Sequence, residues 1–164
     1  EAVDVNVLLS QVSGEYQSRF ELCRLEPIVK LAPESPQILA DGKLLWRVFD
    51  NLLSNICKYA MPGTRVYIAL EHRGRTVATV FRNISEQPLE KSGDELTERF
   101  VRGDNSRSGE GSGLGLSIAA GLAAVQGGSL SVTADGDLFK VEVLLPAINE
   151  EPAAVPVPTA TAEN

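Results

Sequence analysis

The sequence predicts an α/β (α+β) two-layer sandwich, in which a mixed β-sheet carries helices packed on one face. Two segments, 41–60 and 114–125, have the apolar spacing of helices. Two pairs of strand-like segments are each joined by a short turn that contains glycine. Strands mixed in this way with helices that have one apolar side are typical of a sheet covered on one face.

The N-terminal part of the chain is expected to contain one helix and two short strands. Apolar residues predict a helix from about Asn6 to Leu22, and they are Leu8, Leu9, Val12, Tyr16 and Phe20. Asn6, or Asp4 one turn earlier, is expected to cap this helix. The strands are expected at 27–31 and 37–39, on either side of an Ala-Pro-Glu-Ser-Pro linker.

The next predicted helix begins at Asp41 and ends near Ala60, before Pro62-Gly63. One side of this helix, an arc of about 100°, is apolar and is expected to pack on the sheet. It comprises Leu45, Phe49, Leu52, Leu53 and Ile56.

Two hairpins and a second long helix are expected in the rest of the chain. The first hairpin pairs 64–71 with 76–82 around Arg73-Gly74, and the last pairs 129–134 with 138–145 across Asp135-Gly136. Between them lies a polar segment, 84–112, with a short helical stretch near 95–100. The helix 114–125 is expected to end at Gly127-Gly128.

The composition limits the number of domains and argues against several classes of function. We expect one domain, 1–146, followed by a disordered Ala/Pro/Glu-rich tail, 147–164. A net charge of −7 argues against a nucleic-acid surface, and one His with two Cys argues against a structural zinc site. No apolar run approaches the ~20 residues of a membrane span, and two Cys fit a reducing, cytoplasmic compartment.

A column of polar side chains on the helix 41–60 is the first candidate site. Asn51, Asn55 and Lys58 share one face, with Tyr59 at its edge. An ordinary solvated face is the alternative interpretation, but Asn is a poor helix former and two of them one turn apart need a reason. An amide oxygen is a hard neutral ligand suited to Mg²⁺, and a Lys is a point charge for phosphate.

A glycine-rich turn is the second candidate. Seven of the fourteen glycines lie between Gly109 and Gly128, and the run Gly111-Ser-Gly113-Leu-Gly115-Leu leads directly into the helix 114–125. Such a backbone can approach a polyphosphate, and a helix N-terminus supplies unpaired N–H groups. The alternative is a merely flexible loop. The run is neither a Walker A loop nor a good dinucleotide fingerprint.

Together these stretches resemble the catalytic and ATP-binding domain of sensor histidine kinases, the Bergerat fold of the gyrase, chaperone, kinase and mismatch-repair ATPase (GHKL) superfamily. The segment that starts Asp50-Asn-Leu-Leu-Ser-Asn resembles the N box of that family, Glu98-Arg-Phe-Val-Arg-Gly-Asp resembles its F box, and Gly111-Ser-Gly-Leu-Gly-Leu resembles its second glycine box. The resemblance covers about Asp4 to Pro146, and three boxes in order are a strong signal.

The resemblance implies ATP and Mg²⁺ as cofactors, and it implies a role for each matching residue. Asn55 would ligate Mg²⁺ with Asn51 assisting, Lys58 would meet phosphate, and Tyr59 would lie against the adenine. Catalysis would rest on Asn51, Asn55 and Arg102, with Arg102 facing the γ-phosphate. Phe100 would anchor a mobile lid over the pocket. The phosphates would be cradled by the glycine-rich turn, comprising Gly111, Ser112, Gly113, Leu114 and Gly115.

One box departs from the family pattern. Relatives usually have Asp-x-Gly-x-Gly after the central hairpin, and the Asp accepts a hydrogen bond from the adenine amino group. Here the segment is Asn83-Ile-Ser85-Glu-Gln87. The Asn83 amide oxygen can still accept that bond, but without charge assistance, so weaker ATP binding is expected.

The resemblance also implies which chemistry the chain supports. Hydrolytic members of the superfamily have a Glu where this chain has Asn51, and an amide cannot activate water as a base. The chain is therefore expected to donate phosphate to a His on a separate dimerisation domain, since the only His, His72, is expected to be an ordinary hairpin residue. A response regulator would be an indirect partner and a membrane-anchored parent kinase is expected, while the isolated domain should be monomeric, without direct membrane contact.

Two other functions remain open from the sequence. One is a serine kinase of the anti-sigma type, which shares the fold and would phosphorylate a Ser-bearing protein. The other is a degenerate docking module that no longer binds nucleotide, which the segment around Asn83 would favour.

Overall fold

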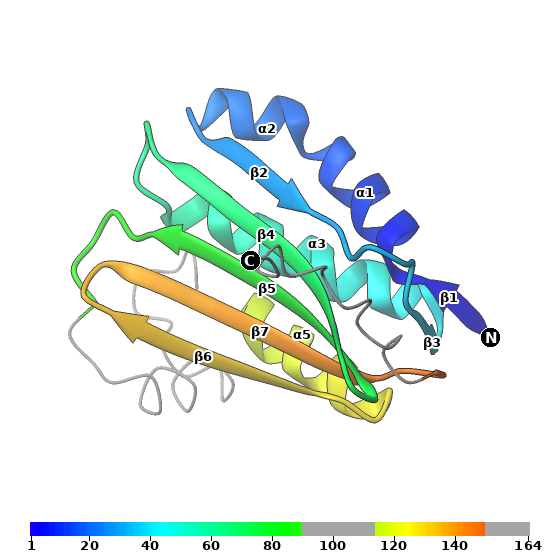
Figure 1. Cartoon of the computed structure of the whole chain (residues 1–164). Helices are drawn as coiled ribbons and strands as arrows, with labels where there is room; N and C mark the ends of the chain where they lie inside the picture. The colour runs from blue at the N-terminus through cyan, green and yellow to red at the C-terminus, as the bar shows by residue number, and fades with distance from the viewer. Residues whose placement is uncertain (90–113, 150–164) are drawn as a thin grey trace, which may run out of the picture.

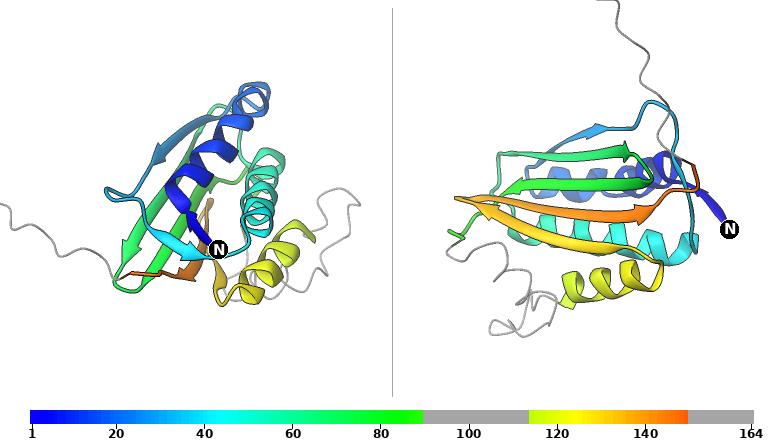
Figure 2. Two further views of the ribbon diagram at one scale, coloured as in Figure 1. Left: turned by 90° about the vertical axis from the view of Figure 1, so that its right-hand side faces the viewer. Right: turned by 60° about the horizontal axis from the view of Figure 1, so that its bottom comes forward.

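The structure, a computed structural model, describes residues 1–89 and 114–149, and these residues form two layers. One layer is a five-stranded sheet of order β2-β4-β5-β7-β6, and the other contains the helices (Figure 1). Seen along the strands, helices α1, α3 and α5 lie side by side on one face of the sheet (Figure 2). The predicted two-layer sandwich with a mixed sheet is therefore confirmed.

The N-terminal segment forms β1 (Ala2–Asp4), α1 (Val5–Glu15) and α2 (Gln17–Leu22). The prediction of a single helix over 6–22 is wrong, because a turn at Tyr16, whose N–H donates to the carbonyl of Ser13, separates the two helices. The buried side chain of Tyr16 reaches α3, where its hydroxyl bonds to Asp50. Asp4 caps α1 by accepting from the N–H of Val7, as one of the two alternatives expected. Asn6 is instead buried, and its amide both donates to and accepts from the backbone of Ala32.

Two short strands follow, β2 (Glu26–Lys30) and β3 (Gln37–Leu39), and they belong to different sheets. Strand β2 runs parallel to β4 at one edge of the large sheet. Strand β3 pairs antiparallel with β1, a strand that the sequence pattern did not predict. With only three residues, β1 is too short for a period-2 pattern to be visible.

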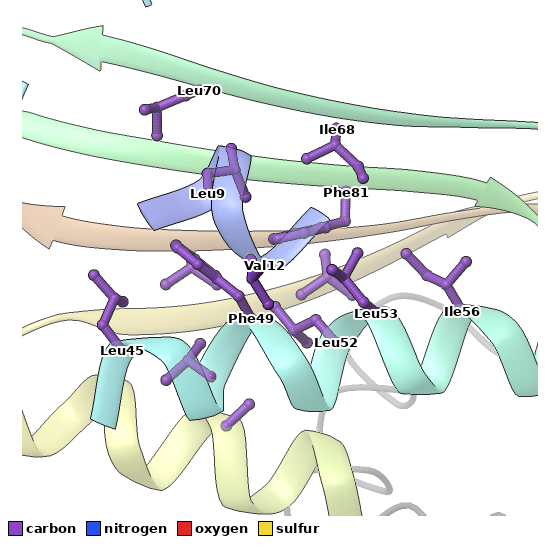
Figure 3. Packing of buried hydrophobic residues seen from close by; sticks show 14 of the residues in the cluster. Leu9, Val12, Leu45, Phe49, Leu52, Leu53, Ile56, Ile68, Leu70 and Phe81 are labelled. Atoms are coloured by element: carbon purple, nitrogen blue, oxygen red, sulfur yellow. The ribbon is translucent and has the colours of Figure 1, made fainter. Parts of the chain in front are cut away.

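Helix α3 (Gly42–Tyr59) is capped by Asp41, which accepts from the N–H groups of Lys43 and Leu44. Its buried face comprises the five predicted residues and Val48. This face meets side chains of the sheet and of α1 (Figure 3), and the rings of Phe49 and Phe81 are 6.0 Å apart. The contact joins the middle of α3 to the central strand of the sheet.

Two antiparallel hairpins complete the sheet. The first joins β4 (Arg65–Arg73) to β5 (Thr76–Ile84), and the second joins β6 (Ser129–Asp135) to β7 (Leu138–Pro146). Each turn lies one residue later than predicted and begins with glycine, Gly74 at φ +60° and Gly136 at φ +61°. A positive φ at the first central residue is where a type II′ turn takes glycine, and that turn matches the twist of a hairpin.

Helix α5 (Leu114–Val125) ends in a Schellman motif. Gly127, at φ +83°, donates to the carbonyl of Ala124, and Gly128 donates to the carbonyl of Ala123. The helix ends at these two glycines, as predicted, but the two positions require glycine for different reasons. Gly127 has a positive φ, and Gly128 packs closely against β7. A Cβ on Gly128 would lie 2.6 Å from Cδ2 of Leu145 and closer still to the carbonyl oxygen of Leu144.

The described chain continues three residues past the predicted domain boundary at 146. Ala147 and Ile148 donate backbone hydrogen bonds to the carbonyls of Arg75 and Gln37. His72, at the end of β4, donates from Nε2 to the carbonyl of Asn149 at 3.0 Å. The rest of the predicted tail, 150–164, lies outside the described residues, as do residues 90–112 of the polar segment, with the helical stretch and the lid expected there. Within 1–89 and 114–149, none of the helices has the length and hydropathy to span a membrane.

The packing at Gly128 predicts that Gly128→Ala lowers the free energy of unfolding by about 1–3 kcal/mol, because the new methyl group overlaps β7. Gly121→Ala is the matched control on α5, since a Cβ there would meet nothing within 4 Å. This control should gain up to about 1 kcal/mol from helix propensity. Urea unfolding of both variants measures the difference, and equal stability would contradict the close approach.

A second prediction concerns Thr79 on the helix-facing side of β5. Its hydroxyl is buried without a hydrogen-bond partner among the described residues, between Leu70 of β4 and Val143 of β7. Thr79→Val should raise the free energy of unfolding by about 1 kcal/mol, because it removes an unsatisfied polar group at nearly equal volume. The reverse change on the same face, Val77→Thr, should destabilise the domain. A less stable Thr79→Val protein would show that the hydroxyl is satisfied.

Candidate functional site

Helix α3 lies between α1 and α5 and presents a different stripe of residues to each neighbour (Figure 2). At about 100° per residue, the apolar stripe faces the sheet. Asp50 and Cys57, seven residues apart, lie on the flank toward α1 and α2, where Tyr16 and Cys23 contact them. Asn51 and Asn55 lie on the other flank, toward α5. The predicted polar column is therefore separate from the core and from the α1 side.

The polar column is half-buried at both asparagines and at Tyr59, and it is exposed at Lys58. The Nδ2 atom of Asn51 is buried and has no hydrogen-bond partner within the part of the chain that the structure describes. A buried amide donor without a partner costs about 1–3 kcal/mol. Such an atom is a reason to expect a ligand, a water molecule or another polar group at this position.

The first turn of α5 lies against Asn51. A Cβ on Gly115 would be 3.7 Å from the backbone oxygen of Asn51 and 4.0 Å from its Cβ. The end of the glycine-rich turn and the asparagine column, 64 residues apart in the sequence, are thus neighbours in the fold. The backbone of α5 begins at this point, and the first N–H groups of a helix have no partners within it.

Asn83, near the end of β5, is 3% exposed and lies on the same face of the sheet as Phe81. The residues after it are held against the end of α3. Met61 donates to the carbonyl of Ile84 at 2.7 Å, and Glu86 donates to the carbonyl of Tyr59 at 2.9 Å. Ser85 also forms a β-bridge with Ala60. These bonds place Asn83 beneath the last turns of α3, at the Tyr59 end of the polar column.

The structure does not describe every predicted site residue. Phe100, Arg102, Gly111, Ser112 and Gly113 lie outside the described residues. Leu114 is the first residue of α5, and only its backbone is described. The part of the site that can be placed is therefore the α3 column, Gly115 and Asn83.

Tyr16 and Asp50 form a hydrogen-bonded pair on the flank of α3 that faces α1, and the sequence pattern does not reveal this pair. The hydroxyl of Tyr16 lies 2.5 Å from Oδ1 of Asp50 and 3.0 Å from its backbone oxygen. Burial, and next the hydrogen bond to Asp50, raise the pKa of Tyr16 well above its usual value, so the phenol remains a donor at all physiological pH. The guanidinium of Arg19 covers the Tyr16 ring at 4.6 Å.

The bond between Tyr16 and Asp50 also keeps the Asp50 carboxylate away from the polar column. Asp50 is the carboxylate next to Asn51 in the sequence, but it accepts from Tyr16 and lies about 100° around the helix from Asn51 and about 140° from Asn55. The side chains that share the column are two amides and an ammonium group, so the column offers neutral oxygen ligands and one positive charge. No group of three or more His, Cys, Asp or Glu side chains that could hold a metal occurs among residues 1–89 and 114–149.

Residues 40–149 match the family described as histidine kinase-, DNA gyrase B- and HSP90-like ATPases. The chain is 32% identical over 153 residues to the sensor-like histidine kinase SenX3 of Mycobacterium tuberculosis, covering 90% of this chain and 37% of that protein. It spans about a third of the length of the curated relatives it matches.

Solved structures agree with this assignment. The mycobacterial sensor histidine kinase MprB superposes with a TM-score of 0.72 at 26% identity, covering 92% of this chain and 99% of that chain. Full-length ShkA in complex with AMPPNP superposes with a TM-score of 0.74 at 25% identity, covering 96% of this chain and 32% of that chain. Because the matched segment includes α3, the sheet and α5, the chain belongs to the family of histidine kinase-, DNA gyrase B- and HSP90-like ATPases.

Proposed function

We propose that this chain is the ATP-binding, phosphoryl-donating domain of a two-component sensor histidine kinase. The observation that carries the proposal is the asparagine column of α3, with the unpartnered amide of Asn51 beside the first turn of α5. SenX3 and MprB, which are similar to this chain, are named as histidine kinases, and ShkA is named in complex with AMPPNP. The phosphate acceptor in this proposal is a His on a separate dimerisation domain, with a response regulator further along.

The described residues fit ATP and Mg²⁺. The amide oxygen of Asn55 is a hard, neutral ligand of the kind that Mg²⁺ accepts beside water and phosphate oxygens. The buried Nδ2 of Asn51 would donate to a phosphate oxygen or a metal-bound water, which would satisfy it. When bound, Mg²⁺ would neutralise charge on the phosphates during transfer.

The other residues would orient the nucleotide. Lys58, exposed at the end of the column, would attract the phosphates as a mobile positive charge. The ring of Tyr59 would lie against the adenine, and buried Asn83 would accept from the adenine amino group. The backbone N–H groups at the start of α5 would face the phosphates beside Asn51. The role of Arg102 and of residues 111–113 in the same cradle is part of the proposal.

The column favours transfer over hydrolysis. Asn51 cannot take a proton from water at neutral pH, and Asp50 is held on the flank toward α1 by its bond to Tyr16. A nucleotide bound here would keep its γ-phosphate until an imidazole from another domain reaches it. Catalysis would then be positioning plus charge neutralisation.

The first test separates the polar column from the core stripe of the same helix. Asn55→Ala should weaken Mg²⁺-ATP binding by about tenfold or more, because a lost bond to a charged ligand costs about 1.5–3 kcal/mol. Its stability without nucleotide should change by less than about 1 kcal/mol. Calorimetry with Mg²⁺-AMPPNP and urea unfolding measure the two effects.

Ser54→Ala, one position away on α3, is the matched control and should bind as the unchanged chain does. Leu52→Ala should instead lose about 2–5 kcal/mol of stability, since Leu52 is 1% exposed. Equal losses of stability in Asn55→Ala and Leu52→Ala would contradict the assignment of the two faces. An unchanged chain that bound no nucleotide at millimolar concentration would support the docking-module alternative instead.

The second test identifies the acceptor. With radiolabelled ATP and Mg²⁺, the chain should label an added dimerisation domain that carries the phosphoacceptor His, and the label should be acid-labile. The chain alone should remain unlabelled, because His72 bonds to Asn149 and pairs with Val77 beside the hairpin turn, at the end of β5 opposite Asn83. Acid-stable label on a Ser-bearing protein partner, without any His domain, would favour the serine-kinase alternative.

A further inference from the structure

The two cysteines of the chain meet on the flank of α3 that faces away from the asparagine column. Cys57 lies in the last turn of α3, about 200° around the helix from Asn55. Cys23 follows α2 directly, 34 residues earlier in the sequence. The sequence interpretation treats both as packing residues, and nothing in the proposed phosphoryl transfer uses either.

The backbone holds Cys23 at a defined position. Leu25 donates to the carbonyl of Phe20 and Arg24 donates to that of Glu21, which makes a Schellman motif at the end of α2. Arg24 takes the left-handed conformation of this motif at φ +58°, and the N–H of Gly63 donates to its carbonyl. Cys23 is the C-cap of α2, so its backbone is held by the helix before it and by the hydrogen-bonded turn after it.

The thiol of Cys23 meets the end of α3. The Sγ atom donates to the carbonyl oxygen of Cys57 at 3.5 Å. That carbonyl lacks its usual helical partner, because the N–H of Met61 donates to Ile84 instead. The Sγ atom of Cys23 therefore lies against the backbone of Cys57, and the nearby Cys23 also helps to raise the pKa of the Cys57 thiol.

The surroundings of the two thiols are partly buried and include one positive charge. Burial, and next the nearby Cys23, raise the pKa of Cys57 to about 11. Arg19 acts in the opposite direction and adds a positive charge close to the pair. Cys23 is half-buried between two exposed residues, Leu22 and Arg24. Cys57 is half-buried as well, so both thiols are partly accessible to an oxidant from solvent.

We propose that Cys23 and Cys57 form a reversible disulfide under hydroperoxide stress, which ties the end of α2 to the last turn of α3. Cys23 attacks one oxygen of hydrogen peroxide and becomes a sulfenic acid, and the other oxygen leaves as water. Cys57 then displaces the sulfenic oxygen as a second water, giving the S–S bond. In total, two thiols lose two electrons and two protons, and one peroxide becomes two waters. Reduction by a dithiol reverses the step.

The disulfide would act on the nucleotide site through α3, and this part rests on the proposed function. Formation of the S–S bond removes the thiol proton of Cys23, and with it the hydrogen bond from Cys23 to the Cys57 carbonyl. Cys57 lies two residues from both Asn55 and Tyr59, in the turn that Glu86 also anchors. A shift of this turn moves the polar column relative to α5, so oxidation should weaken nucleotide binding.

Peptide mapping tests the disulfide without reference to nucleotide. After peroxide treatment and blocking of free thiols, trypsin should yield peptides 20–24 and 48–58 joined as one species, because each contains one cysteine between cleavage sites. Dithiothreitol should separate them. Cys23→Ser, which keeps a donor for the Cys57 carbonyl, and Cys57→Ser should each abolish the species. Separate peptides with sulfinic or sulfonic acid on Cys23, or links between two chains only, would overturn the proposal.

Nucleotide binding tests the regulatory part. The oxidised chain should bind Mg²⁺-AMPPNP about fivefold or more weakly than the reduced chain, a coupling at the lower end of the usual range between two sites. Dithiothreitol should restore the affinity, and Cys23→Ser should not respond to peroxide. Linked peptides with unchanged affinity would overturn the regulatory part. A reduced chain that binds no nucleotide would overturn the proposed function and leave the disulfide standing.

Discussion

The burial of one face of α3 on the central strands of the sheet is the interaction on which the other features depend. Six side chains of this helix are buried, and Phe49 meets Phe81 at the middle strand. At about 1.5–3 kcal/mol for each large apolar side chain, this contact is a major favourable contribution to folding. Because the rotation of α3 about its axis is set by this face, the directions of its other residues are set as well.

Each flank of α3 then has its own neighbour. Toward α1 and α2, Tyr16 bonds to Asp50 and Cys23 bonds to the end of the helix. Toward α5, the helix surface is close enough that Gly115 lies against Asn51. The proposed nucleotide site and the proposed redox site are therefore opposite sides of one rigid element. A shift of α3 caused by disulfide formation on one side would also move the asparagine column on the other side. This shared movement is the physical basis of the coupling we propose.

The agreement between sequence pattern and structure differs from element to element. The apolar stripe of α3, its cap at Asp41 and the two hairpins are confirmed, because helical and strand periodicity are local properties of the chain. The apolar pattern does not reveal the break at Tyr16, because apolar residues continue on the same side through the turn. It does not reveal β1 either, because this strand depends on pairing with a distant strand. The sequence pattern predicts that Gly128 ends a helix, and its close approach to Leu144 appears only in three dimensions.

The sequence by itself determined which residues share a face of α3, since about 3.6 residues per turn place Asn51, Asn55 and Lys58 together in any fold. It also determined the motifs by which the family is recognised. Only the tertiary structure decided what lies opposite each face: Gly115 beside Asn51, and Cys23 beside Cys57. These contacts join residues 64 and 34 positions apart, and they depend on how the whole helical layer packs on the sheet, which no local pattern encodes.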